Sequence, residues 1–179
     1  LISEITDKAK KLYEEDENYT DLDINSELKN LEKRIVRTDI LKNKNIDLAV
    51  HALKDLPIKE TKGLITNCFL KRNKSNEVLI SNTNETLKDL VPGSIIGTSS
   101  FRREFQLKQI RKDLNFKLIR GNIDTRIKKL KNGEYDAIIL SKAGLDALDV
   151  TNEITQEFSC NELIPSAGQG TIAIQCREK

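Results

Sequence analysis

The chain has 179 residues and a formal net charge of +2 at pH 7, with 37% hydrophobic, 4% aromatic and 32% charged residues. This composition is typical of a soluble globular protein that forms one large domain or two small lobes. No stretch approaches the roughly 18 apolar residues of a membrane helix, and a net charge this small gives no support to nucleic-acid binding, so we expect neither a membrane nor a nucleic acid as partner.

The first part of the chain predicts helices followed by two apolar strands. Apolar residues recur at helical spacing in the first stretch, whereas the later runs are continuous and follow turn signals. In chain order, the predicted elements are a helix over 1–15, a short strand near 19–24, a helix from about 26 and strands over 46–52 and 64–70.

From residue 77 onward, strands and helices alternate. The predicted strands cover 77–81, 94–100, 116–121 and 135–141, and a last apolar strand closes the chain. The predicted helices between them cover 85–91, where Pro92 and Gly93 stop the helix, 101–113 and 125–134.

This alternation predicts an α/β fold with two lobes, built on mixed and mostly parallel sheets with helices on both faces. The polar stretches 71–77 and 164–169 are candidate linkers between the lobes. We expect lobe 1 to comprise 1–72 plus 168–179, because the last strand returns to it, and lobe 2 to comprise 73–167. A cleft between two such lobes is where ligands bind in open α/β folds.

The stretch "GTSSFRR" places two arginines in the first turn of a predicted helix, after the hydroxyl residues Ser99 and Ser100. Helix N-termini attract anions, so the cations Arg102 and Arg103 are mildly unfavourable there without a partner. Guanidinium groups bind carboxylates and phosphates with two hydrogen bonds, which would provide the reason. The alternative is an ordinary serine cap followed by two solvated arginines.

The stretch "LIRGNIDTR" repeats this arrangement at the next strand end. Arg120 ends a predicted strand, Asn122 or Asp124 can cap the following helix, and Arg126 lies inside that helix. Arg177, just after the last strand, is a third candidate. Arginines at successive junctions of one sheet predict a small ligand with several negative charges.

The stretch "HALKDLP" adds a carboxylate to this basic pocket. Asp55 is the candidate catalytic residue, because an ionised aspartate can stabilise a cationic intermediate or transfer a proton. Lys54 can bind a carboxylate of the ligand, and His51 is expected to be a hydrogen-bonded structural residue. The single histidine lacks partners at ligand spacing, so no metal site is predicted.

The stretch "PSAGQG" near the C-terminus predicts a hinge at Gly168 and Gly170, where the backbone must bend or approach another segment closely. The cysteines, Cys68, Cys160 and Cys176, show neither CxxC nor metal-ligand spacing. They are expected to be reduced thiols in a cytosol-like compartment.

Taken in order, "DLAVHALKDLP", "GTSSFRR", "LIRGNIDTRIKKLKNGEYDAIILSKAGLDAL" and "IPSAGQGTIAIQCR" resemble the porphobilinogen deaminase (hydroxymethylbilane synthase) family. The resemblance implies two lobes like those of type II periplasmic binding proteins, plus a smaller third domain. It also implies condensation of four porphobilinogens, with loss of ammonia, to hydroxymethylbilane in tetrapyrrole biosynthesis. The implied cofactor is dipyrromethane, joined to a cysteine by a thioether bond.

By position, Asp55 resembles the family's catalytic aspartate, which would assist ammonia release and stabilise positive charge on the intermediates. Gln169 matches the glutamine of the hinge segment. The resemblance further implies that cofactor and substrate carboxylates are bound by Lys54, Ser99, Ser100, Arg102, Arg103, Arg120, Arg126, Gln169 and Arg177.

The family's third domain, which holds the cofactor cysteine, has no counterpart before Lys179, and Cys160 and Cys176 lie in other motifs. We therefore expect the chain to be an excerpt of a longer, monomeric enzyme, with the attachment cysteine outside it. The expected compartment is the cytoplasm, or a plastid if a transit peptide lies upstream. A non-catalytic two-lobed protein that binds a small polycarboxylate is the alternative function.

Overall fold

The computed structural model describes residues 41, 42, 44 and 46–178, and these form two compact units. The first unit contains the described residues up to Val50, then Pro57–Cys68 and the residues from Ile174; the second contains His51–Leu56 and Phe69–Ala173. The predicted helices within residues 1–40 lie outside the described residues.

The division between the units differs from the predicted one, because the segment that carries Lys54 and Asp55 belongs to the second unit. Backbone hydrogen bonding explains this assignment: the amide of Leu53 donates to the carbonyl of Thr171 over 2.9 Å. Residues Leu53–Asp55, which form a 3₁₀ turn, are therefore held by the segment that precedes the last strand.

A three-stranded sheet contains the last strand between the first two, in the order β1-β8-β2. The last strand of the chain therefore pairs with both β1 and β2. The strands are β1 (Leu48–Ala52), β8 (Ile172–Arg177) and β2 (Leu64–Phe69).

The second unit is built on a five-stranded sheet with the order β5-β4-β6-β3-β7. Strand β4 pairs in parallel with β5 and β6, whereas β3 pairs antiparallel with β6 and β7. The prediction of a mixed sheet is confirmed, but this sheet is not mostly parallel: parallel pairing is confined to β5-β4-β6, and β3 is antiparallel to both of its neighbours. The strands are β3 (Glu77–Ser81), β4 (Ile95–Gly97), β5 (Asn115–Lys117), β6 (Ala137–Ser141) and β7 (Gln156–Glu157).

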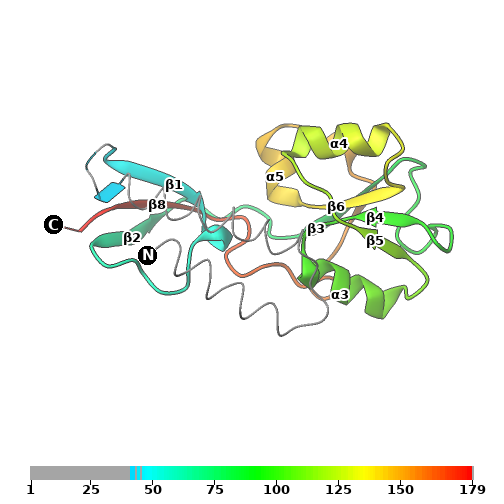
Figure 1. Ribbon diagram of the computed structural model, residues 1–179, viewed down its shortest axis with the longest axis horizontal. Helices are drawn as coiled ribbons and strands as arrows, with labels where there is room; N and C mark the ends of the chain where they lie inside the picture. Colours follow the sequence, from blue (N-terminus) through cyan, green and yellow to red (C-terminus); the bar gives the residue numbers. More distant parts are fainter. Residues whose placement is uncertain (1–40, 43, 45, 179) are drawn as a thin grey trace, which may run out of the picture. The chain divides into compact units, whose positions relative to one another are not determined.

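Helices cover both faces of this sheet, which explains why its central strands are mainly apolar. Figure 1 shows α3 (Phe101–Ile110) on one face, and α4 (Ile123–Lys131) and α5 (Lys142–Ala147) on the other. Successive residues of a strand point to opposite faces, so Leu79 packs in the core beneath α3, and Val78 packs in the core beneath α4 and α5.

Two predictions about local structure are wrong. Residues 85–91 form turns instead of a helix, because the guanidinium of Arg111 binds the carbonyls of Leu87, Lys88 and Leu90, at 2.7–2.8 Å. The strand predicted over 116–121 ends at Lys117, so Arg120 lies in the loop after it. The 3₁₀ turns are η1 (Leu53–Asp55) and η2 (Thr151–Glu153).

Candidate functional site

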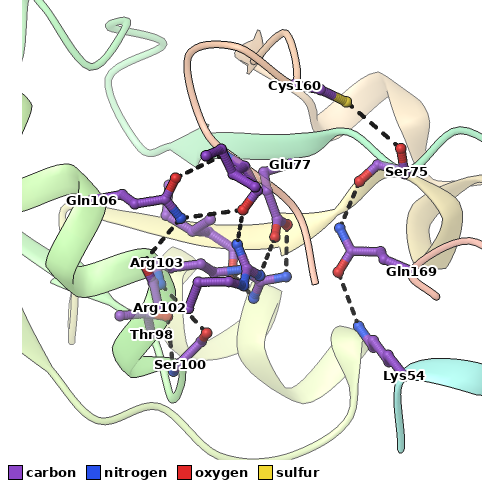
Figure 2. Close-up of polar contacts among 12 residues, drawn as sticks. Lys54, Ser75, Glu77, Thr98, Ser100, Arg102, Arg103, Gln106, Cys160 and Gln169 are labelled. Atoms are coloured by element: carbon purple, nitrogen blue, oxygen red, sulfur yellow. Dashed lines mark hydrogen bonds and ion pairs between the residues drawn. The ribbon is translucent and has the colours of Figure 1, made fainter. Parts of the chain in front are cut away.

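Lys54 and Asp55 lie on the short 3₁₀ turn η1, directly after strand β1. Both residues are exposed, and the Asp55 carboxylate has no hydrogen-bond or ion-pair partner among the described residues. The Lys54 ammonium group donates to Oε1 of Gln169 over 3.3 Å (Figure 2). The turn therefore presents a carboxylate that the described part of the protein leaves available to a ligand.

The ammonium group of Lys54 lies near charges of both signs. Partial removal of the ammonium group from water is the largest effect and lowers the pKa of Lys54 from the usual 10.5. The positive charges of Arg103 and Arg102 lower it further, against the opposing effects of Asp55 and Glu77. An anionic ligand would relieve this repulsion. The pKa shift thus indicates an ammonium group that is partly removed from water and lies near two arginines.

Arg102 and Arg103 open helix α3, as the sequence predicts. Ser100 is the N-cap, and its hydroxyl accepts a hydrogen bond from the Arg103 amide over 3.4 Å. Both guanidinium groups bind the carboxylate of Glu77, at 2.5 Å from Arg102 and 2.7 Å from Arg103 (Figure 2). The arginines are thus neither solvated nor wholly available to a ligand.

Arg103 is the more deeply buried of the two, with 7% of its surface exposed. Its Nη1 donates to the carbonyl of Ile139 over 3.0 Å and its Nη2 to Glu77, whereas its buried Nε has no hydrogen-bond partner in the described part of the chain. A buried donor without an acceptor costs about 1–3 kcal/mol. This N–H is therefore a candidate contact for an anionic ligand.

Arg102 contacts the segment that leads to the predicted hinge. Its Nη1 donates to the carbonyl of Ile164. The side-chain amide of Gln106 binds both backbone groups of the same residue, accepting from its N–H over 2.8 Å and donating to its carbonyl over 3.1 Å. Arg102 thus joins helix α3, strand β3 and the start of segment 164–171.

Arg120 and Arg126 lie in the loop after β5 and in the first turns of α4. Gly121 between them has a φ of +117°, and a Cβ there would lie 2.7 Å from Thr125. Its carbonyl accepts from Nε of Arg126 over 2.8 Å. Burial lowers the pKa of Arg126, as do the charges of Arg103 and Arg120, which indicates that these cations share one region.

Gln169 is 1% exposed and joins three segments. Its Nε2 donates to the carbonyl of Ser75 over 2.7 Å, its Oε1 accepts from Lys54, and its carbonyl accepts from Arg72 over 3.0 Å. Figure 2 shows the amide between Ser75 and Lys54. Gln169, which was predicted to bind carboxylates of the ligand, therefore already uses its side-chain amide in hydrogen bonds within the protein.

The glycines on either side of Gln169 permit this close approach, and both have positive φ. A Cβ on Gly170 would lie 2.6 Å from the carbonyl oxygen of Asn73, and one on Gly168 would lie 2.8 Å from the side chain of Leu53. Side chains at these positions would push apart the segments that Gln169 joins.

The structure brings most of the predicted site residues into the second unit: Lys54, Asp55, Ser99, Ser100, Arg102, Arg103, Arg120, Arg126 and Gln169. Ser99 is exposed, and Ser100 serves as the helix cap. Arg177 lies in the first unit, where its guanidinium binds the Asp47 carboxylate and the carbonyls of Leu41 and Ile46.

Glu77 is the residue that sequence reasoning missed. It opens the otherwise apolar strand "EVLIS", and it is completely buried. A charged residue in a strand covered on both faces was the available signal, since buried charges need partners.

Residues 18–179 match the family model described as porphobilinogen deaminase, dipyromethane cofactor binding domain. The chain is 49% identical over 136 residues to porphobilinogen deaminase of Bacillus pumilus and 47% identical over 133 residues to that of Nitratiruptor sp.. These alignments cover 75% and 73% of this chain but only 44% and 43% of the relatives, so the chain spans less than half of their length.

Among solved structures, the chain is similar in fold to the BenM effector binding domain with its effector benzoate. The TM-score is 0.50 at 13% identity, and the alignment covers 80% of this chain and 66% of that one. This likeness concerns the α/β fold alone.

Proposed function

Because the chain belongs to the porphobilinogen deaminase family, we propose that it carries the ligand-binding and catalytic site of an enzyme that condenses four porphobilinogens to hydroxymethylbilane. The observation that carries this proposal is an excess of positive charge around one available carboxylate. The mutually repelling cations are Lys54, Arg102, Arg103, Arg120 and Arg126, against the carboxylates of Asp55 and Glu77.

Substrate binding follows from this charge balance. Each porphobilinogen carries two carboxylates, so a growing chain of pyrroles needs several cations. Among the described residues, the guanidinium of Arg120 has no ion-pair partner, and Arg126 uses only its Nε, which donates to Gly121. We assign to these arginines and to Lys54 the binding of acetate and propionate groups, with Arg103 contributing its unpaired Nε–H.

Asp55 is proposed as the catalytic residue. When ammonia leaves the aminomethyl group of the substrate, positive charge develops on the pyrrole ring, and a nearby carboxylate stabilises that charge. A positioned carboxylate that also transfers a proton contributes about 10²–10⁴ in rate. Its exposure and lack of a partner in the described structure leave Asp55 available for this role.

The described residues fit the dipyrromethane cofactor that the family model names. The buried and unpaired Nε–H of Arg103, together with Arg120 and Arg126, provides donors for a group with several carboxylates. When bound, dipyrromethane supplies the pyrrole to which the first substrate is joined. Its attachment cysteine is proposed to lie outside this chain.

We further propose that the protein acts as a monomer in the cytoplasm, as a soluble enzyme of haem biosynthesis, without nucleic acid. Both relatives described above are bacterial, which favours the cytoplasm over a plastid. Among the described residues, no helix is long and apolar enough to span a membrane.

The test uses the full-length protein that contains this chain. We expect it to consume porphobilinogen and release one ammonia per substrate, and its intact mass is expected to exceed the sequence mass by a covalently attached dipyrromethane. Binding of porphobilinogen without ammonia release would contradict the proposal and favour the alternative, a non-catalytic polycarboxylate-binding protein.

A further inference from the structure

The buried carboxylate of Glu77 occupies an unusual position for a charged group. It begins strand β3, has no exposed surface and binds two guanidinium groups, one on each oxygen. The partners lie 25 and 26 residues away, at the start of helix α3. A carboxylate this buried is stable only when paired.

The two arginines are neighbours in sequence, and neighbouring side chains of a helix point in different directions. Nothing in the helix itself would bring both guanidinium groups together, and their like charges oppose it. The Glu77 carboxylate attracts both groups and holds them side by side, since Oε1 binds Arg102 and Oε2 binds Arg103 (Figure 2).

The contacts also fix which donors remain available. In Arg103, Glu77 and the Ile139 carbonyl bind the two terminal nitrogens, so that Nε–H is left without a partner in the described structure. In Arg102, Glu77 binds Nη2, and Nη1 binds the Ile164 carbonyl. One negative charge against two positive charges keeps this part of the site cationic.

We propose that Glu77 is a positioning residue, which holds Arg102 and Arg103 in the orientation that binds the carboxylates of substrate and cofactor. This inference rests on the proposed function. A purely structural role, in which Glu77 only neutralises buried charge, is the competing explanation.

The first experiment measures the kinetics of porphobilinogen consumption by full-length variants. Glu77→Gln keeps the shape but removes the charge, and we expect KM to rise more than tenfold while kcat falls less than threefold. Glu77→Asp keeps the charge one methylene further from the arginines, and we expect a three- to tenfold rise in KM in a folded protein. The matched control is Glu104→Gln, which removes a surface ion pair with Lys108 on the same helix and should leave KM unchanged.

Glu77→Gln leaves two arginines without the carboxylate that neutralises them. If this variant does not fold, the kinetics of Glu77→Asp decide the question. A folded variant at Glu77 with reduced thermal stability but wild-type KM would overturn the proposal and establish the structural role.

A second measurement does not depend on activity. The Nε–H of Arg103 gives a signal in a ¹H–¹⁵N correlation spectrum, assigned by its loss in Arg103→Lys. We expect this signal to shift and to exchange faster with solvent in Glu77→Asp. An unchanged signal would overturn the positioning role, whereas absence of porphobilinogen turnover by the wild-type protein would contradict only the proposed function.

Discussion

Replacing Gly170 with alanine is expected to destabilise the protein by about 2–3 kcal/mol. Gly170 has a φ of +85°, and a left-handed conformation costs an L-residue about 1–2 kcal/mol. The added Cβ would lie 2.6 Å from the carbonyl oxygen of Asn73, which is backbone and cannot rotate away. Displacing it would weaken the 2.8 Å hydrogen bond from the Asn73 amide to the Gly170 carbonyl, worth about 1 kcal/mol.

The matched control is Gly93→Ala. Gly93 has a nearly identical φ of +88° but no atom within 4 Å of the added Cβ. Gly93→Ala should therefore lower the free energy of unfolding only by the cost of the left-handed backbone. Alanine also restricts the unfolded chain, which offsets roughly 0.4–1 kcal/mol of that loss. The difference between the two variants isolates the close packing at Gly170.

The assay is urea unfolding of both full-length variants, monitored by circular dichroism. The free energies of unfolding are compared only if the variants have equal m-values. Because Gly170 adjoins Gln169, which binds Lys54, the Gly170 variant should also bind porphobilinogen more weakly. Equal destabilisation of the two variants would refute the claim that residue 170 packs closely against the backbone of Asn73.

Two further predictions concern the cations. Lys54→Met should stabilise the protein against urea at pH 7, because a lysine whose pKa is lowered by folding opposes folding while it is protonated. This gain in stability should shrink as the pH rises towards 10.5, the pKa of lysine in the unfolded chain. A loss of stability at pH 7 would contradict the prediction. Arg126→Gln should weaken porphobilinogen binding about tenfold or more without loss of thermal stability, since this arginine lies among other cations. The control is Lys128→Gln, at an exposed position of the same helix, which should leave binding unchanged. Calorimetric titration measures both affinities.

The local features of the second unit could be predicted because they depend on neighbouring residues. The cap at Ser100 and the arginines after it follow from the turn "GTSS", and the buried strand over 77–81 follows from its apolar run. Helix α4 begins at Ile123, two residues before the predicted start, and Asn122, one of the two predicted caps, occupies the N-cap position without a side-chain hydrogen bond.

The remaining features depend on contacts between distant residues. The pairing of Glu77 with Arg102 and Arg103 joins residues more than 20 positions apart, and the spacing of residues in helices or strands does not predict such a contact. Arg111 binds the carbonyls of Leu87 and Leu90, which overrides the helical pattern over 85–91. The Gln169 amide looked available to a ligand only because its partners, Ser75 and Lys54, are 94 and 115 residues away.

The most direct test of the account is ammonia release by full-length Asp55→Asn. Asparagine keeps the shape of the side chain but carries no negative charge, so cationic intermediates lose their stabilisation. Ammonia release should fall at least a hundredfold, the lower end of the contribution of a positioned acid–base group, while porphobilinogen still binds within threefold of the wild-type affinity. Ammonia release at the wild-type rate would contradict the assignment of Asp55 as the catalytic residue.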